Sequence, residues 1–311
     1  MPIESGRMAE FFDRLGHKII HSSNACWYEV QPGVLLSIPY YKLVEPTEQE
    51  LQELIKSHKL QAIRFPTTLN NYGFISNIVI NTNVNYDLTS LHQKARNQTR
   101  RALESCTVKQ VDFDFLREHG LPLNIDTAQR QGRESQYAYS DYWQKFCGAA
   151  KVVEGVSAWG SFIDGQLAAF LVAVEAGDWV EWIVNHSSTV LRNKYPNNAL
   201  AFTAAQYFFQ TKKCVGICYG LGSLEPTPEL DHFKQRMGWR LEPVKQRLVF
   251  ANKLALAAAI AQEPFLKLIG GLFPKSYKIR KTFAMIRLYR KQTADIPTIT
   301  VPWETGEQCH E

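Results

Sequence analysis

The 311-residue chain lacks the cysteine patterns that mark metal-binding and disulfide-rich proteins. Its six cysteines form no Cys-x-x-Cys pair, and no histidines and cysteines cluster at the spacing of a zinc site. Cys214 and Cys218 are four residues apart on an expected strand, too far from each other for an easy disulfide. We therefore expect reduced thiols, no metal and, without a recognisable signal peptide, a cytoplasmic protein.

The chain also lacks a long hydrophobic run. The apolar segments 254–260 and 265–273 are broken by Glu263-Pro264 and Gly270-Gly271, and neither approaches the ~20 residues that span a bilayer. We expect no transmembrane helix. With 45% hydrophobic and 12% aromatic residues, the composition is that of a folded globular protein, and the length suits about two domains.

Excess positive charge is confined to one stretch of the chain. The net charge is +5, but residues 251–291 carry nine lysines and arginines against one acidic residue, Glu263. This stretch includes an expected basic helix, 277–291, whose apolar stripe is Ile279, Phe283, Ile286 and Tyr289. Three interpretations are open: docking of the stripe on the core, contact of residues 275–291 with an anionic membrane surface, or binding to tRNA phosphates.

In residues 151–250, some segments place apolar residues at every second position, as strands do, and others at helical spacing. Asp164-Gly165 is a hairpin signal between two strands, Thr227-Pro228 begins a helix, and Gly238 ends that helix. The expected elements are strands 157–163, 166–174, 179–185, 214–219 and 239–250, with helices at 197–210 and from 227 up to Gly238. The order is β-β-β-α-β-α-β.

Residues 1–150 also mix helices and strands, which predicts a mixed α+β fold for the whole chain. Glu48 and Glu50 follow Pro46-Thr47 and so lie in the first turn of an expected helix, where the helix dipole favours acidic side chains. The expected elements are strands 26–30, 33–38, 60–65, 74–82 and 107–113, with helices 7–15, 48–58, 89–105, 114–119 and 125–146.

Three segments in this order resemble the GNAT superfamily of acyltransferases, and more closely its FemAB-like branch: AWGSFIDGQLAAFLVAV, LRNKYPNNALAF and YGLGSLEPTPELDHFKQRMGW. The resemblance implies two tandem acyltransferase-like halves. The expected division is a degenerate N-terminal half (1–113), bridging helices (114–150), the acyltransferase half (151–250) and a basic helical extension and tail (251–311).

The same resemblance implies acyl transfer to an amine. In GNAT proteins a splayed strand, here 179–185, offers main-chain N–H groups to the acyl carbonyl, and the next helix begins at the coenzyme A pyrophosphate. Arg192, Lys194, Asn197 and Asn198 are the expected cofactor contacts. The usual glycine-rich loop is absent from LRNKYPNNAL, as in FemAB-like proteins, which use aminoacyl-tRNA. Both acyl-coenzyme A and aminoacyl-tRNA therefore stay open as donors.

Three residues are candidates for proton transfer. Glu181, among apolar neighbours on the expected strand, would have a raised pKa and suit a general base; the alternative is a solvent-facing carboxylate. His186 stands at the end of that strand, where ligands collect, but a lone loop histidine is often incidental. Tyr219 suits reprotonation of the leaving group, unless it is a core tyrosine with a satisfied hydroxyl.

Three basic residues are candidates for substrate binding. By the resemblance, Lys234 contacts a phosphate of the acceptor or supports the reacting carboxyl; the alternative is a solvated surface lysine. Arg96 and Arg100 share a helix face and suit phosphate or carboxylate recognition, unless that face is only solvated. The sequence thus predicts an N-acyltransferase acting on a small-molecule or cell-envelope precursor, cytoplasmic or membrane-associated. The alternative is a catalytically inactive binding or membrane-surface module of the same fold.

Overall fold

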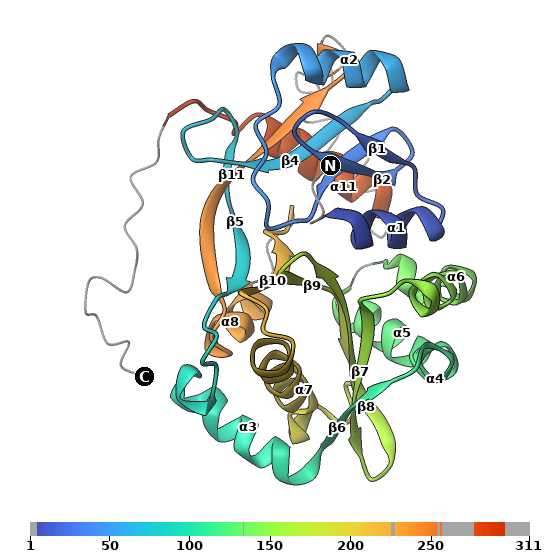
Figure 1. The fold of residues 1–311 in the computed structure, drawn as a ribbon, viewed down its shortest axis with the longest axis vertical. Helices are drawn as coiled ribbons and strands as arrows, with labels where there is room; N and C mark the ends of the chain where they lie inside the picture. The colour runs from blue at the N-terminus through green and yellow to red at the C-terminus, as the bar shows by residue number, and fades with distance from the viewer. Residues whose placement is uncertain (1–4, 133, 225–227, 254–255, 257–276, 296–311) are drawn as a thin grey trace.

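The computed structural model describes residues 5–132, 134–224, 228–253, 256 and 277–295. One mixed sheet of eleven strands runs through the molecule, in the order β1-β2-β3-β4-β11-β5-β10-β9-β8-β7-β6. Helices cover both faces of the sheet, so the mixed α+β class is confirmed (Figure 1). The strands are β1 (Ile19–His21), β2 (Cys26–Gln31), β3 (Val34–Ile38), β4 (Ala62–Thr67), β5 (Phe74–Asn81), β6 (Thr107–Val111), β7 (Val156–Ile163), β8 (Gln166–Ala176), β9 (Trp179–Ser187), β10 (Gly216–Leu221) and β11 (Arg240–Phe250).

The helices follow the predicted order, with the differences given below. They are α1 (Gly6–Arg14), α2 (Glu48–His58), α3 (Gln93–Ser105), α4 (Phe113–His119), α5 (Leu121–Arg130), α6 (Ser140–Val152), α7 (Pro196–Gln206), α8 (Pro228–Arg236) and α11 (Tyr277–Tyr289), with short 3-10 turns η2 (Leu88–Ser90), η3 (Gln136–Ala138) and η4 (Arg192–Lys194) and a π turn, η5 (Tyr207–Thr211), after α7.

Local signals determine several of these boundaries. The hydroxyl of Thr47 accepts a hydrogen bond from the N–H of Glu50 at 3.1 Å and caps α2. Asp164 and Gly165 both have positive φ, as a tight hairpin of the type I′ class requires. Gly238 has φ +86, and a side chain there would meet the carbonyl oxygen of Ser90 at 3.0 Å.

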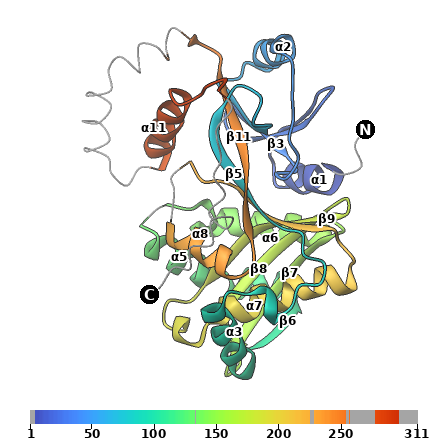
Figure 2. The ribbon, with the colours of Figure 1, turned by 90° about the vertical axis from the view of Figure 1, so that its left-hand side faces the viewer.

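The middle of the sheet interleaves strands from distant parts of the chain. β11 pairs antiparallel with both β4 and β5, and β5 also pairs antiparallel with β10. The long strands β5 and β11 run side by side from the upper to the lower part of the molecule (Figures 1 and 2). At the far edge β6 pairs with β7. One sheet therefore crosses both expected halves, and the domain boundaries at 113 and 150 stay a prediction.

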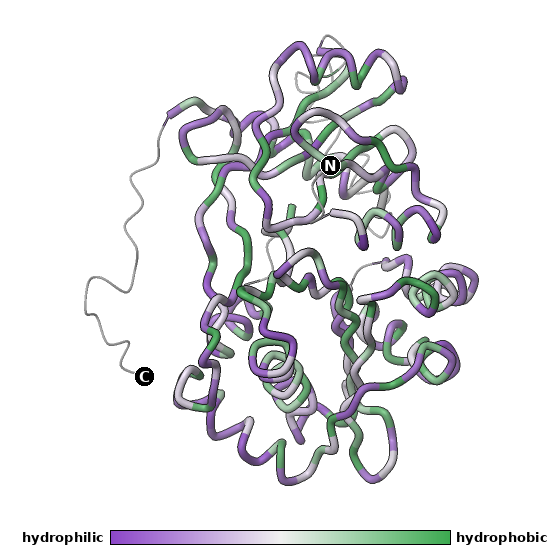
Figure 3. Tube along the Cα trace, viewed as in Figure 1, coloured by the Kyte–Doolittle hydropathy of each residue, from purple (hydrophilic) through white to green (hydrophobic). Residues whose placement is uncertain are grey.

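Two helix layers enclose the strands β7 to β9. One face packs against α1, α4, α5 and α6 in a cluster that includes Phe11, Trp143 and Phe170. The other face packs against α7 in a cluster that includes Trp182 and Phe208. Helix α3 lies outside α7, and its tube is mostly hydrophilic in Figure 3. Each strand of this region is thus buried on both sides.

Two predicted elements, one in the bridging segment and one just before it, had wrong boundaries. A single helix was expected over 125–146, but α5 ends at Arg130 and α6 begins at Ser140. Gly132, with φ +59, turns the chain between them. The strand expected at 107–113 ends at Val111, because the carboxylate of Asp112 accepts from the N–H of Phe115 at 2.7 Å and begins α4.

Helix α11 docks on the sheet, as one of the three interpretations of the basic segment proposed. Tyr289 of the expected stripe contacts Phe74 and Leu248, joined by Ala284, Met285 and Leu288 in place of Phe283 and Ile286; the side chain of Ile279 lies outside the described residues. The ring of Tyr289 lies 5.2 Å from that of Phe250, edge to face. The predicted stripe was therefore about one residue out of phase. In the described ranges, every helix is too short or too polar to cross a bilayer.

Candidate functional site

The parallel pairing of β9 with β10 stops at the third of the nine residues of β9. Three pairs join the strands, and the last is Glu181 with Cys218. Beyond it β9 continues to Ser187 beside β8, while β10 continues to Leu221 beside β5. Within the part of the chain that the structure describes, no strand pairs with the open side of residues 182–187. The strand predicted to splay does so, and we call this gap in the pairing the split.

Glu181 lies at the point where the two strands part. Its side chain is fully buried, and Oε1 accepts a hydrogen bond from the main-chain N–H of Tyr41 at 3.2 Å. Burial raises the pKa of Glu181 to about 7, although the Cys218 thiol and the N–H groups of Tyr41 and Tyr40 oppose the rise. Its other oxygen, Oε2, has no hydrogen-bond partner. The solvent-facing alternative for this carboxylate is therefore wrong.

A bulge in β9 brings His186 to the same face of the sheet as Glu181. Residues five apart on a regular strand point to opposite faces. Here Ile183 is skipped in the pairing with β8, so that Glu181 stands opposite Val174 and His186 opposite Phe170, both in the α1–α6 cluster. The imidazole Nδ1 of His186 hydrogen-bonds Oδ1 of Asn124 on α5.

Tyrosines that the sequence analysis did not single out complete this face. The ring of Tyr41 stacks on Trp179, with centroids 4.4 Å apart, and its hydroxyl donates to the carbonyl of Ala176. The hydroxyls of Tyr40 and Tyr28 are 2.9 Å apart. Burial raises the pKa of Tyr40, and the nearby Tyr28, Tyr137 and Glu181 raise it further. The adjacent tyrosines after the strand that ends at Ile38 were the available signal.

Tyr219 and Lys234 lie on the opposite face of the sheet. The Tyr219 ring is 5.4 Å from that of Trp182, and the Nζ of Lys234 lies 4.6 Å above it. Lys234 is only 8% exposed, so the alternative of a solvated surface lysine is wrong. Burial raises the pKa of Tyr219, and the side chain of Asn185 opposes this. The predicted proton-transfer residues therefore divide between the two faces of the split.

The predicted substrate contacts on α3 differ in their surroundings. The guanidinium of Arg96 donates to three main-chain carbonyls, those of Leu88, Thr89 and Leu91, at 2.9 to 3.1 Å. These bonds hold the turn before α3, so this side chain is already engaged with the protein. Arg100 is exposed one turn later on α3. Binding of substrate by either arginine stays a prediction.

The predicted cofactor contacts lie at the start of α7. Arg192 and Lys194 are exposed on η4. The Asn197 side chain donates to the hydroxyl of Ser187 at 3.0 Å. Asn198 is buried, and its side chain faces the sulfur of Met237. The Asn198 side chain is thus not at the surface that a coenzyme would contact, because the first turn of α7 packs inward under Met237.

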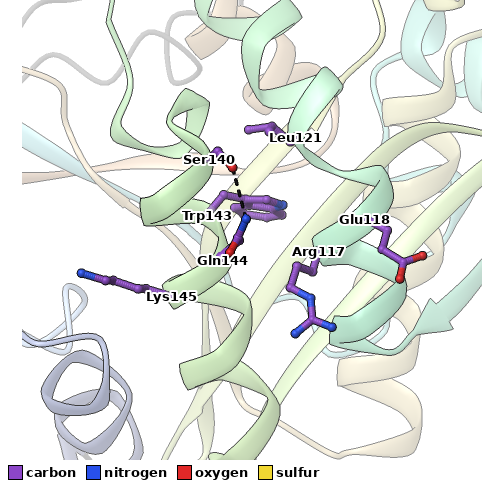
Figure 4. Close-up of a pocket in the computed structure, with 7 residues that line it drawn as sticks. All are labelled: Arg117, Glu118, Leu121, Ser140, Trp143, Gln144 and Lys145. Atoms are coloured by element: carbon purple, nitrogen blue, oxygen red, sulfur yellow. Dashed lines mark hydrogen bonds between the residues drawn. The ribbon is translucent and has the colours of Figure 1, made fainter.

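An open hollow of about 600 Å³ lies elsewhere, on the surface between α4 and α6 (Figure 4). It is lined by Arg117, Glu118, Leu121, Ser140, Trp143, Gln144 and Lys145. None of the predicted site residues is among them. Among the described residues, no three histidine, cysteine or acidic side chains are grouped to hold a metal ion.

Comparison with solved structures identifies the fold. FemX is similar over 85% of this chain and 93% of its own, with a TM-score of 0.55 and 13% identity. L-PGS from Bacillus licheniformis covers 84% of this chain and 95% of its own, with a TM-score of 0.47 and 14% identity. A tandem GNAT protein from the clavulanic acid biosynthesis pathway covers 75% and 82%, with a TM-score of 0.46 and 10% identity. The sequence matches no protein-family model and no curated protein. The chain therefore shares its fold with FemX, in agreement with the FemAB-like fold that its sequence motifs predicted.

Proposed function

We propose that the protein is an N-acyltransferase whose reaction takes place at the split between β9 and β10. The observation that carries this proposal is the end of pairing at Glu181 and Cys218 while both strands continue. Main-chain N–H groups freed from a sheet are fixed donors, and such donors stabilise the oxyanion that forms when an amine attacks an acyl carbonyl.

Glu181 is the proposed general base. The amine nitrogen forms a bond to the carbonyl carbon, its proton passes to the carboxylate, and the bond from that carbon to the leaving oxygen or sulfur breaks. A proton passes to the leaving atom from Tyr219 in this proposal, and Glu181 then releases its proton to solvent while Tyr219 takes one back, which restores both groups. A pKa of about 7 makes the carboxylate a stronger base than an ordinary glutamate near neutral pH. Because Glu181 is fully buried and bonded to the main chain of Tyr41, the amine reaches it only after the segment around Tyr41 moves.

An aminoacyl ester is the favoured donor in this proposal, and acyl-coenzyme A is the second choice. The glycine-rich loop is absent and Asn198 faces inward, which removes groups that would bind a pyrophosphate at α7. Arg192 and Lys194 remain on the surface there and suit tRNA phosphates. The proposed acceptor is an amine on a small-molecule or cell-envelope precursor, reached in the cytoplasm or at a membrane surface that residues 275–291 contact.

A binding module without catalysis is the second candidate. Glu181 is completely enclosed, and its bond to Tyr41 links the expected N-terminal and C-terminal halves. A buried carboxylate with this partner can serve structure alone. If the protein is such a binding module, substitutions at Glu181 change its stability, and neither the natural protein nor the variants transfer an acyl group.

The deciding experiment compares donors with the purified protein. Acetyl-coenzyme A and aminoacyl-tRNA are each incubated with a panel of amines, and products are detected by mass spectrometry. The proposal expects transfer from one donor, lost in Glu181→Gln and retained in Glu154→Gln, whose side chain is 93% exposed. Thermal shift with each donor gives an independent measure of binding. Stabilisation by a donor without any transfer would favour the binding module.

A further inference from the structure

The side chain of Asn124 joins the imidazole of His186 to the main chain of Tyr137. Asn124 lies on α5 and is completely buried. Its Nδ2 donates to the carbonyl of Tyr137 on η3 at 2.9 Å, and its Oδ1 faces Nδ1 of His186 on β9. The three groups therefore form one chain of hydrogen bonds that ends at the imidazole.

The chemistry of these groups decides which imidazole nitrogen carries a hydrogen. A main-chain carbonyl only accepts hydrogen bonds, so the atom of Asn124 that faces Tyr137 is the amide nitrogen and not the oxygen. The oxygen therefore faces Nδ1 of His186, and an amide oxygen also only accepts. It follows that Nδ1 carries a hydrogen. In the neutral imidazole, the lone pair that accepts a proton is then on Nε2.

Further contacts hold the imidazole and the strand beneath it. The rings of Tyr137 and Phe170 lie edge to face with the imidazole, with centroids 5.9 Å and 5.7 Å away. At the next residue of β9, the N–H of Ser187 donates to the hydroxyl of Thr127 on α5 at 3.2 Å. Helix α5 therefore fixes the open end of β9 at two successive residues, His186 through its side chain and Ser187 through its main chain.

We propose that Asn124 is a positioning residue for proton transfer by His186, because it fixes the Nδ1–H form and so makes Nε2 the atom that accepts a proton. An alkyl ammonium has a pKa of about 10 and cannot attack a carbonyl until it loses a proton. It loses a second proton as the amide forms. His186 takes the first proton and releases it to solvent, and Glu181 takes the second. This use of Nε2 rests on the function proposed above, whereas the tautomer rests on the hydrogen bonds alone.

His186 and Glu181 act at different points along β9. Their partners on β8, Phe170 and Val174, are four residues apart, which is about 13 Å along a strand. One nitrogen atom cannot contact both side chains at once. His186 is only partly buried and so acts on the amine as it enters, whereas Glu181 is fully buried and acts in the attack itself.

The direct test measures the tautomer of His186 by nitrogen NMR of the protein with isotope-labelled histidine, at a pH at which the imidazole is neutral. The resonances lost in His186→Gln assign this residue among the eight histidines. His17 is the internal reference, because its Nδ1 lies 2.7 Å from the main-chain carbonyl oxygen of Glu29 and therefore also carries a hydrogen. The proposal expects the Nδ1–H form at both positions. A neutral His186 with its hydrogen on Nε2 in the natural protein overturns it.

Two substitutions separate this positioning role from a purely structural one. Asn124→Asp keeps an oxygen that accepts from Nδ1, so the Nδ1–H form and most of the transfer rate should be retained. Asn124→Leu removes the acceptor, so His186 should become a mixture of both tautomers, and kcat/KM should fall by about 100-fold, the size of effect expected of an acid–base group. The tautomer of His17 should not change in either variant. Lower stability of Asn124→Leu with an unchanged tautomer of His186 would assign Asn124 to structure alone.

These outcomes are separable from those of the proposed function. An Nδ1–H form that is present in the natural protein and lost in Asn124→Leu, in a protein that transfers no acyl group from any donor, leaves the fixed tautomer standing and removes the acyltransferase. Transfer at an unchanged rate in Asn124→Leu, whatever the tautomer, leaves the acyltransferase and removes His186 from the reaction.

Discussion

The carboxylate of Glu181 accepts a hydrogen bond from the main-chain N–H of Tyr41, which stands 140 residues earlier in the chain. This bond joins the segment after β3 to the strand at which the sheet opens. The carboxylate is fully buried, and its pKa is raised to about 7. The charge on the group that bonds Tyr41 therefore changes with pH near neutrality. Stability and the proposed catalysis should therefore depend on pH through the same group.

The first prediction concerns stability. The pKa of Glu181 rises from about 4.5 in the unfolded chain to about 7 in the folded protein, so the folded state holds the proton more tightly. The resulting stabilisation is present below pH 4.5 and is lost as pH rises to 7, by about 3 kcal/mol. Glu181→Gln should remove this loss, so the variant gains stability over the natural protein above pH 7.

Urea unfolding of both proteins across this pH range measures the effect. Because other groups titrate in both proteins, the difference between the two curves isolates Glu181. Glu154→Gln serves as a matched control at an exposed site. A difference that does not vary with pH would show that Glu181 titrates in the ordinary range.

The second prediction concerns rate. If Glu181 is the general base, kcat/KM should rise with pH through an apparent pKa of about 7 and then level. Glu181→Gln should lower kcat/KM by about 100-fold or more, because the carboxylate no longer takes the proton. Steady-state rates with the donor found above give both values. A variant that keeps the rate and the pH profile of the natural protein assigns Glu181 to structure.

The third prediction separates charge from packing at Lys234. Lys234→Met keeps an unbranched side chain over Tyr219 but removes the ammonium group. Transfer should fall about tenfold or more, as expected for a lost contact to a charged group, while the melting temperature changes little. Lys56→Met, at an exposed position on α2, is the control for loss of a lysine. A large fall in melting temperature without a change in rate would contradict the proposed role.

The fourth prediction concerns Lys245, a fully buried lysine on β11. Its ammonium donates to the carbonyls of Asn71, Thr293 and Asp295 at 2.7 to 3.1 Å. Lys245→Met should cost roughly 2–4 kcal/mol, since three buried carbonyls lose a charged donor. Hydrogen exchange should become faster at residues 292–295, which this side chain fastens to the sheet. Unchanged exchange there would show that Gln292, bonded to both main-chain groups of Leu248, suffices.

The fifth prediction tests whether α11 only docks on the sheet or also contacts a membrane surface. Ala284 is 2% exposed against the sheet, so Ala284→Asp should destabilise the protein by roughly 2–4 kcal/mol through burial of a charge. Thr282→Asp, at an exposed position of the same helix, should change stability little. If residues 275–291 also contact membranes, Thr282→Asp should weaken sedimentation with anionic vesicles. Vesicle binding that both variants leave intact would exclude α11 from such contact.

Local chemistry made much of the secondary structure predictable. Helix α2 spans the expected residues 48–58 and begins at the acidic first turn after Thr47, and the Asp164-Gly165 hairpin joins β7 to β8. These signals act within a few residues, so tertiary contacts do not alter them. The same holds for the order of motifs that indicated the FemAB-like GNAT fold. The site was harder to predict, since the sequence did not indicate on which face of the sheet each candidate residue lies.

By itself, the sequence determined the mixed α+β class and the order of the elements, and it left burial of Glu181 as one of two alternatives. Only the tertiary structure decided that β11 lies between β4 and β5, and that Tyr219 and Lys234 face away from Glu181. The order of strands in a sheet depends on pairing between residues far apart in the chain. The spacing of apolar residues along one strand contains no information about its partner. The bulge at Ile183 shifts the phase of β9 by one residue, and one residue is enough to change the face on which a side chain lies.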